Sequence, residues 1–94
     1  MVNTPNIWPS PRLIRAARGL IGISQAALAE TAGVTQKTIT KIEADDSDAM
    51  DPRRLKVLRE LQRALEDVYG VEFFAASEHS GEGVRFRKSK AEEL

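Results

Sequence analysis

The residues of this chain best suited to chemistry lie in one short polar stretch, residues 36–41 (QKTITK). One glutamine, two lysines and two threonines there offer hydrogen-bond donors, and no acidic residue interrupts them. The chemistry open to such a set is non-covalent: it donates hydrogen bonds and presents positive charge to a ligand rich in acceptors. Residues 36–41 are therefore the first candidate for a binding surface.

Catalytic chemistry has little support elsewhere in the chain. The one histidine, His79, lies in a loop that contains glycine, and there is no cysteine to act as a nucleophile or a metal ligand. The glycines of residues 81–83 (GEG) make no phosphate cradle, because no helix follows them. Asp48 and Asp51 lack the alternation and the terminal glutamate of a calcium loop. We expect no enzymatic activity, no cofactor and no metal site.

The elements that must position residues 36–41 are two short helices around a tight turn, predicted over residues 23–42. Ser24 is a helix cap, and Gly33 suits the left-handed position that ends the helix. Thr35 caps the next helix, which runs from Gln36 to about Ala44. Helical spacing predicts that the following residues are buried: Leu28, Ala29, Ala32, Ile39 and Ile42.

A longer helix is predicted on each side of this pair. The first covers residues 11–21, begins at Pro11 and ends at Gly22. Its expected inward residues are Leu13, Ile14, Ala17, Leu20 and Ile21, and its outward ones are Arg12, Arg15 and Arg18. The last covers residues 52–69, with Asp51 as its cap and Gly70 at its end. Its expected buried stripe is Leu55, Leu58, Leu61, Leu65 and Val68.

The ends of the chain have different patterns. Residues 1–10 contain two prolines and are predicted to be an extended arm, in which Trp8 either closes the core or a dimer seam, or touches DNA. Residues 71–88 alternate between apolar and polar side chains around a polar loop, which predicts a two-stranded hairpin with Val84 and Phe86 on one face. Residues 89–94 are expected to be a frayed tail.

Composition and charge restrict the kind of domain that residues 11–70 can form. The hydrophobic content of 41% is enough for one small core. The net charge is zero, but residues 1–43 hold five basic residues against two acidic ones, and an acidic loop follows at 45–51. The short apolar runs, the lack of a signal-peptide pattern and the absence of cysteine lead us to expect a cytoplasmic protein.

The run from Arg12 to about Glu43 resembles the helix-turn-helix family of Cro and phage-repressor proteins, also called the xenobiotic-response-element family. Arg15 and Arg18, followed by SQAALAETAGVTQKTITKIE over residues 24–43, match its pattern in order and spacing. The resemblance implies a mainly α fold: a four-helix lambda-repressor-like helix-turn-helix domain at 11–70, here with a C-terminal two-stranded β-hairpin. It departs from many members in the acidic loop, which must either face away from DNA or weaken binding by like-charge repulsion, so the orientation of this loop stays open.

The resemblance also implies function: a sequence-specific, double-stranded DNA-binding transcriptional regulator, expected to repress as a homodimer on a palindromic operator. In this fold the second helix of the motif enters the major groove. The expected base contacts are Gln36, Lys37, Thr40 and Lys41. The expected backbone contacts are Gln25, Thr35, Thr38 and Arg15, although Arg15 could instead brace Glu43.

Three alternatives stay open at this point. The chain could be an antitoxin that also holds a toxin through its C-terminal hairpin, or a protein-interaction module that keeps the fold without binding DNA. The hairpin could be the dimer seam, because its edge is exposed and Phe73, Phe74 and Phe86 are apolar. Alternatively, it could only cap its own core.

Overall fold

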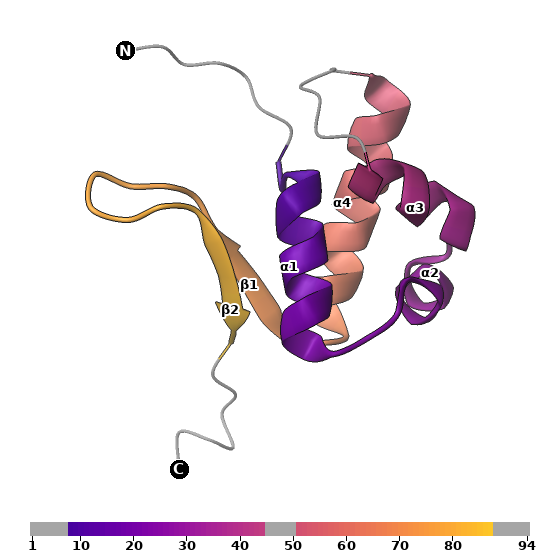
Figure 1. Cartoon of the computed structure of the whole chain (residues 1–94), viewed down its shortest axis with the longest axis horizontal. Coiled ribbons are helices and arrows are strands. Elements are labelled where there is room, and N and C mark those ends of the chain that lie inside the picture. The colour runs from indigo at the N-terminus through magenta and orange to yellow at the C-terminus, as the bar shows by residue number, and fades with distance from the viewer. Residues whose placement is uncertain (1–7, 45–50, 88–94) are drawn as a thin grey trace.

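The computed structural model describes residues 8–44 and 51–87, which form four helices and a two-stranded antiparallel sheet (Figure 1). This architecture confirms the predicted fold class. The elements are α1 (Pro11–Ile21), α2 (Gln25–Ala32), α3 (Gln36–Ala44), α4 (Pro52–Asp67), β1 (Val71–Phe74) and β2 (Gly83–Phe86). Much of the acidic loop and the predicted tail lie outside the described residues, as does most of the N-terminal arm.

Side-chain caps fix where the helices begin. The Ser24 hydroxyl accepts a hydrogen bond from the Ala27 amide at 3.0 Å, and the Thr35 hydroxyl accepts one from the Thr38 amide at 3.1 Å. The Asp51 carboxylate accepts one from the Arg53 amide at 2.9 Å. Each bond satisfies a backbone donor that has no partner within its helix, so the predicted helix starts are confirmed.

The turn between α2 and α3 depends on Gly33. Its φ of 75° lies in the left-handed region, which an L-residue with a Cβ enters only at a cost. The Gly33 amide donates to the Ala29 carbonyl at 2.9 Å and closes the end of α2. This turn lets α3 leave α2 at a fixed angle and pack back on the same core.

One hydrophobic core joins the four helices and the sheet. The amphipathic faces predicted for the helices supply most of it, and Val71 of β1 completes it with no exposed surface. The core consists of Ile14, Ala17, Leu28, Ala29, Ile39, Ile42, Leu58, Leu61, Ala64, Leu65 and Val71.

Two residues predicted to be buried are exposed. Leu20 in the last turn of α1 is 43% exposed, and Val68 is 63% exposed. The structure ends α4 at Asp67, so Val68 follows the helix and turns away from the core instead of extending the buried stripe. The helical period identifies the inward side of a helix but not how far its neighbours extend along it.

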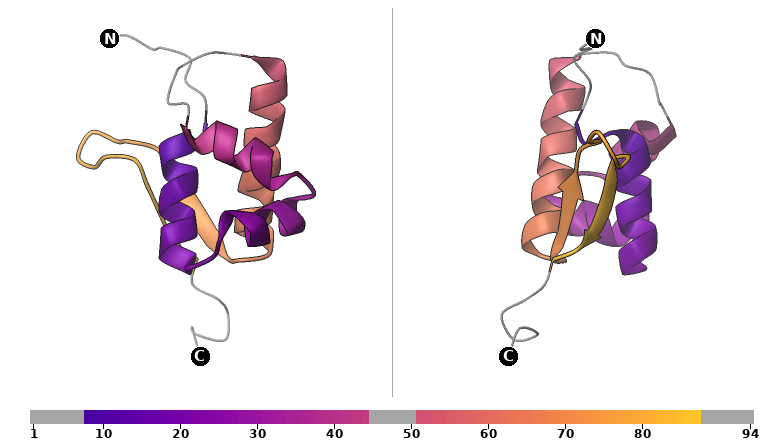
Figure 2. Two further views of the ribbon diagram at one scale, coloured as in Figure 1. Left: turned by 45° about the vertical axis from the view of Figure 1, so that its right-hand side comes forward. Right: turned by 90° about the vertical axis from the view of Figure 1, so that its left-hand side faces the viewer.

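The hairpin covers one side of the helical layer. β1 packs against α4 and β2 against α1, on the side of α1 away from α3 (Figures 1 and 2). In the register Val71↔Phe86 and Phe73↔Val84, these four side chains share the face directed at the helices. Val84 and Phe86 share one face, as predicted; Phe73 and Val84 pack against the core, whereas Phe86 is 54% exposed because it lies at the end of the sheet.

The other face of the hairpin is stabilised by its own side chains. The Arg85 guanidinium donates to the Glu72 carboxylate at 3.1 Å across the strands, and it lies 4.6 Å from the centre of the Phe74 ring. A Cβ at Gly83 would lie 2.6 Å from Cζ of Phe74, so this ring occupies the space that a side chain there would need. Phe74 is therefore engaged within its own hairpin.

Candidate nucleic-acid interface

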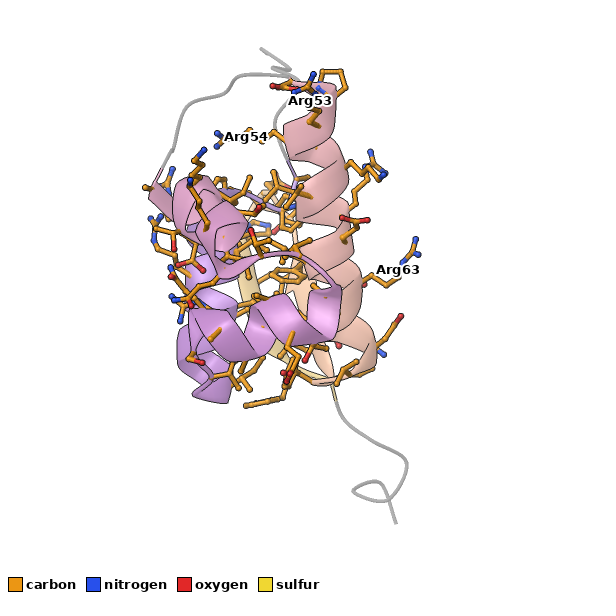
Figure 3. The ribbon with its side chains drawn as sticks, turned by 90° about the vertical axis from the view of Figure 1, so that its right-hand side faces the viewer. Arg53, Arg54 and Arg63 are labelled. Atoms are coloured by element: carbon orange, nitrogen blue, oxygen red, sulfur yellow. The ribbon has the colours of Figure 1, made fainter. Side chains whose placement is uncertain are left out.

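The two faces of α3 have opposite character. Ile39 and Ile42 are buried at 0% and 6% exposure, which holds the helix to the core. The predicted base-contacting residues are all exposed: Gln36, Lys37, Thr40 and Lys41. Figure 3 shows α2 and α3 together at the front of the molecule, with the side chains of α3 directed outward.

Three of these four side chains have no hydrogen-bond or ion-pair partner among the described residues: those of Gln36, Lys37 and Lys41. The amide of Gln36 and the ammonium groups of the two lysines therefore meet only solvent. A ligand can bind them without first breaking an internal contact.

Thr40 differs from them, because it also contacts α2. Its hydroxyl donates to Oε1 of Gln25 at 2.8 Å, and the carbonyl of Gln36 is a second acceptor at 3.1 Å. The structure thus places Thr40 between the outward face of α3 and the first residue of α2. The sequence did not reveal this bond, because residues 25 and 40 have no fixed spatial relation until the turn is built.

Beneath this surface lies a buried carboxylate, Glu43, which is 5% exposed. Arg18 donates to both of its oxygens, from Nε at 2.7 Å and from Nη2 at 2.8 Å. Gln25 donates to Oε1 of Glu43 at 3.0 Å, and Arg15 donates to its backbone carbonyl. These contacts, with the Gln25–Thr40 bond, form the Glu43 network, which ties α1 and α2 to α3.

The network sets the ionisation of both partners. Burial raises the pKa of Glu43, but the hydrogen bonds from Arg18 and Gln25 and the charges of Arg18 and Arg15 outweigh burial and bring this pKa below its ordinary value. The hydrogen bond to Glu43 raises the pKa of Arg18 in turn. Glu43 is therefore a carboxylate at neutral pH, and its charge is neutralised inside the domain.

One expectation for α1 changes as a result. Arg18 was predicted to lie on the outward side of α1, but its guanidinium turns to Glu43 and also donates to the Ile23 carbonyl at 3.1 Å. Arg15 braces Glu43 through the carbonyl, which is one of the two roles expected of it. The closing Ile-Glu of the motif was the available signal, because a glutamate beside a buried isoleucine needs a cation when the helix packs.

Three of the four predicted backbone-contacting residues lie at the starts of α2 and α3, and the fourth, Arg15, lies in α1. Gln25 is the first residue of α2, and the hydroxyls of Thr35 and Thr38 lie 2.9 Å apart at the start of α3. Helix N-termini carry partial positive charge and attract anions. The sequence analysis did not name Arg53 and Arg54, which lie in the first turn of α4, with the Arg54 side chain extending toward α3 (Figure 3). The signal was two arginines directly after the Asp-Pro helix start.

A short helix, a glycine turn and a second helix with one buried and one donor-rich face define the helix-turn-helix class of DNA-binding proteins. The model of a protein family described as helix-turn-helix matches residues 14–73. The chain belongs to this family of Cro and repressor-type regulators, and it is a DNA-binding regulator. A search of the curated proteins found no match.

Other kinds of site were sought in the described part of the chain. None of its helices has the length and hydrophobicity needed to cross a membrane. Its histidine and acidic residues form no group of three or more that could hold a metal ion. Regulators of this family are typically not enzymes.

Proposed function

We propose that the chain is a sequence-specific repressor that inserts α3 into the major groove of double-stranded DNA. The observation that carries this proposal is the unoccupied, acid-free outer face of a helix whose other face is fully packed. Gln36 and Lys37 at its N-terminal end read base edges. Glutamine pairs with N6 and N7 of adenine, and lysine donates to O6 or N7 of guanine. Lys41 and Thr40, one turn later, complete the reading face.

The phosphate backbone is held on both sides of α3. Gln25, at the positive end of α2, donates to a phosphate, and so does one hydroxyl of the Thr35–Thr38 pair, whose other hydroxyl donates within the pair. Arg15, which donates to the Glu43 carbonyl from α1, is the fourth proposed backbone contact. Arg53, in the first turn of α4, adds an exposed cation.

We further propose that two copies occupy a palindromic operator. A single α3 covers only a few base pairs, and paired helix-turn-helix domains read half-sites about 34 Å apart. Repression then follows from occupancy of a site that overlaps a promoter. The number of chains bound to a palindromic duplex and to a single half-site, measured by analytical ultracentrifugation, tests this arrangement. We expect two chains on the palindromic duplex and one chain on the half-site. A single chain on the palindromic duplex would contradict the proposed dimer.

Selection of bound duplexes from a random pool tests the reading face. We expect the wild-type chain to recover one preferred sequence, with Lys37→Ala and Gln36→Ala losing preference at separate positions. Arg63→Ala is the matched control, because it removes an exposed cation on α4 that points away from α3 (Figure 3). It should recover the wild-type sequence. No binding at low salt, or an unchanged sequence in both α3 variants, would overturn the proposal.

A further inference from the structure

The hairpin has a strand edge that the described chain does not cover. Its sheet contains only two strands, so β2 has β1 on one side and no strand on the other. The hairpin also lies on the far side of α1 from α3 (Figure 1). A duplex read by α3 therefore leaves this edge accessible.

The direction of the free backbone groups follows from the register. The Arg87 amide donates to the Gly70 carbonyl at 2.7 Å, which makes the next pair, Val71 and Phe86, a non-hydrogen-bonded one. Hydrogen-bonded and non-bonded pairs alternate in an antiparallel ladder. The amide and carbonyl groups of Val84 and Phe86 therefore point away from β1 and are free to bind another strand.

The side chains around this edge define what would bind there. Phe86 is 54% exposed, and Leu20 is 43% exposed at the end of α1, the helix against which β2 packs. Arg85 and Arg87 alternate with Phe86 and face solvent. Arg85 pairs with Glu72. The Arg87 guanidinium donates to the Val71 carbonyl at 3.5 Å and has no carboxylate partner among the described residues. The edge thus combines apolar surface on one face with two exposed arginines on the other.

We propose that β2 binds an extended segment of a partner protein in which apolar and acidic residues alternate. The segment adds a third strand beside β2 through the backbone groups of Val84 and Phe86. Its apolar side chains cover Phe86 and Leu20, and its acidic side chains lie opposite Arg87 and Arg85. The chain can then hold DNA through α3 and a second protein through the hairpin at the same time.

A second copy of this chain is a poorer occupant of the edge. The register that pairs Val84 with Phe86 of another β2 places Arg85 opposite its own counterpart, and like charges directly opposite each other destabilise a sheet. The other candidate seam residues are used internally, since Phe73 packs on the core and Phe74 lies under Arg85.

The test uses the full chain and two fluorescein-labelled peptides, one of four valine-glutamate repeats and one of four valine-lysine repeats. Fluorescence anisotropy measures binding of each. We expect the glutamate peptide to bind and the lysine peptide to bind at least about tenfold more weakly. Arg87→Glu should reverse this preference. Arg63→Glu, a charge reversal on α4, should leave it unchanged and controls for net charge.

A pair of variants isolates the backbone contact. Phe86→Ala removes the apolar side chain, and Phe86→Pro removes in addition the outward N–H, which no ladder bond uses. We expect Phe86→Pro to bind the glutamate peptide several-fold more weakly than Phe86→Ala, with similar thermal unfolding midpoints. If Phe86→Pro disturbs the hairpin, the charge reversal at Arg87 still decides.

Other results would overturn the inference. Equal binding of the two peptides, or a preference unaffected by Arg87→Glu, would exclude an acidic strand as the ligand. A dimer of the chain alone that Phe86→Pro dissolves in sedimentation would assign the edge to a second copy. Loss of operator binding in Arg87→Glu would assign it to DNA. Because the peptide assay contains no DNA, its failure would not contradict the proposed repressor function. Likewise, failure to bind an operator would not contradict peptide binding by β2.

Discussion

Gln25 uses both ends of its amide inside the protein, donating to Glu43 and accepting from Thr40. The second hydrogen of its NH₂ group is still available for a phosphate. The two internal bonds fix which way this hydrogen points. The proposed phosphate contact of Gln25 therefore depends on Thr40, which we propose acts as a positioning residue for it.

Replacing Thr40 by valine tests this positioning role. The variant keeps the shape of the side chain and loses the hydroxyl, so Gln25 loses one anchor. We expect affinity for all duplexes to fall by about 1 kcal/mol, the worth of one ordinary hydrogen bond, while the preferred sequence is retained. Anisotropy titrations on specific and scrambled duplexes measure it, with Thr40→Ser as the control that keeps the hydroxyl. A change of preferred base would mean that Thr40 reads DNA directly.

The pKa of Glu43 predicts how stability depends on pH. Because this pKa is lower in the folded chain than its ordinary value of 4.5, the folded state gains stability above that value and loses it as pH falls toward the lowered pKa. Glu43→Gln removes the titrating group and leaves Arg18 without its counter-charge. We expect it to lower the free energy of unfolding at pH 7 by about 3 kcal/mol.

Urea unfolding at pH 7 and at pH 3.5 measures this effect. The difference between wild type and Glu43→Gln should be large at pH 7 and smaller at pH 3.5, because this pH lies below the ordinary value of 4.5 and the carboxylate of the unfolded chain then binds a proton. Other carboxylates titrate equally in both proteins and cancel in the comparison. A difference that is independent of pH would show that the charge of Glu43 does not contribute to stability.

At the scale of elements, helix starts were predictable because their signals are local. Ser24, Thr35 and Asp51 each bond an amide two or three residues ahead, so the residues that decide a helix start are neighbours in the sequence. The exposure of Leu20 and Val68 was not predictable in this way. It depends on where adjacent elements end, which only the assembled molecule determines. The same holds for Arg18, whose partner lies 25 residues away.

Gly83 offers a test of the hairpin as an element. In Gly83→Ala the new methyl group meets the Phe74 ring, which must move and weaken its contact with Arg85. We expect the free energy of unfolding to fall by about 1 to 2 kcal/mol. Gly81→Ala is the matched control, because no atom lies within 4 Å of a Cβ there. Thermal unfolding followed by circular dichroism should separate the two, and equal midpoints would contradict the packing role of Gly83.

The hairpin is part of the folded domain rather than a detachable extension. Val71 has no exposed surface, and Phe73 and Val84 pack against the same core. We expect a chain truncated after Tyr69 to lose at least about 3 kcal/mol of stability, since fully burying one such side chain is worth roughly 1.5 to 3 kcal/mol. Chemical denaturation of the truncated chain checks this. A truncated chain as stable as the full one would show that the hairpin contributes nothing to the core.

Charge distribution belongs to the molecule as a whole. The net charge of zero hides a face on which Lys37 and Lys41 have no acidic partner among the described residues. Each phosphate contact made by such a lysine releases counterions, so affinity falls as salt rises. We expect Lys41→Ala to reduce the slope of log affinity against log salt by about 1, whereas Arg63→Ala leaves it unchanged. Titrations at about 50 to 300 mM salt, the range in which affinity falls steeply, measure this slope.

The Glu43 network holds α1, α2 and α3 together through atoms that lie beneath the outward face of α3. The side chains of Gln36, Lys37 and Lys41 therefore take no part in the hydrogen bonding among the described residues. We expect substitutions at these three proposed base contacts to change the preferred operator at little cost in folding. The domain is consequently a scaffold on which new DNA specificities can evolve, or be engineered, one surface residue at a time.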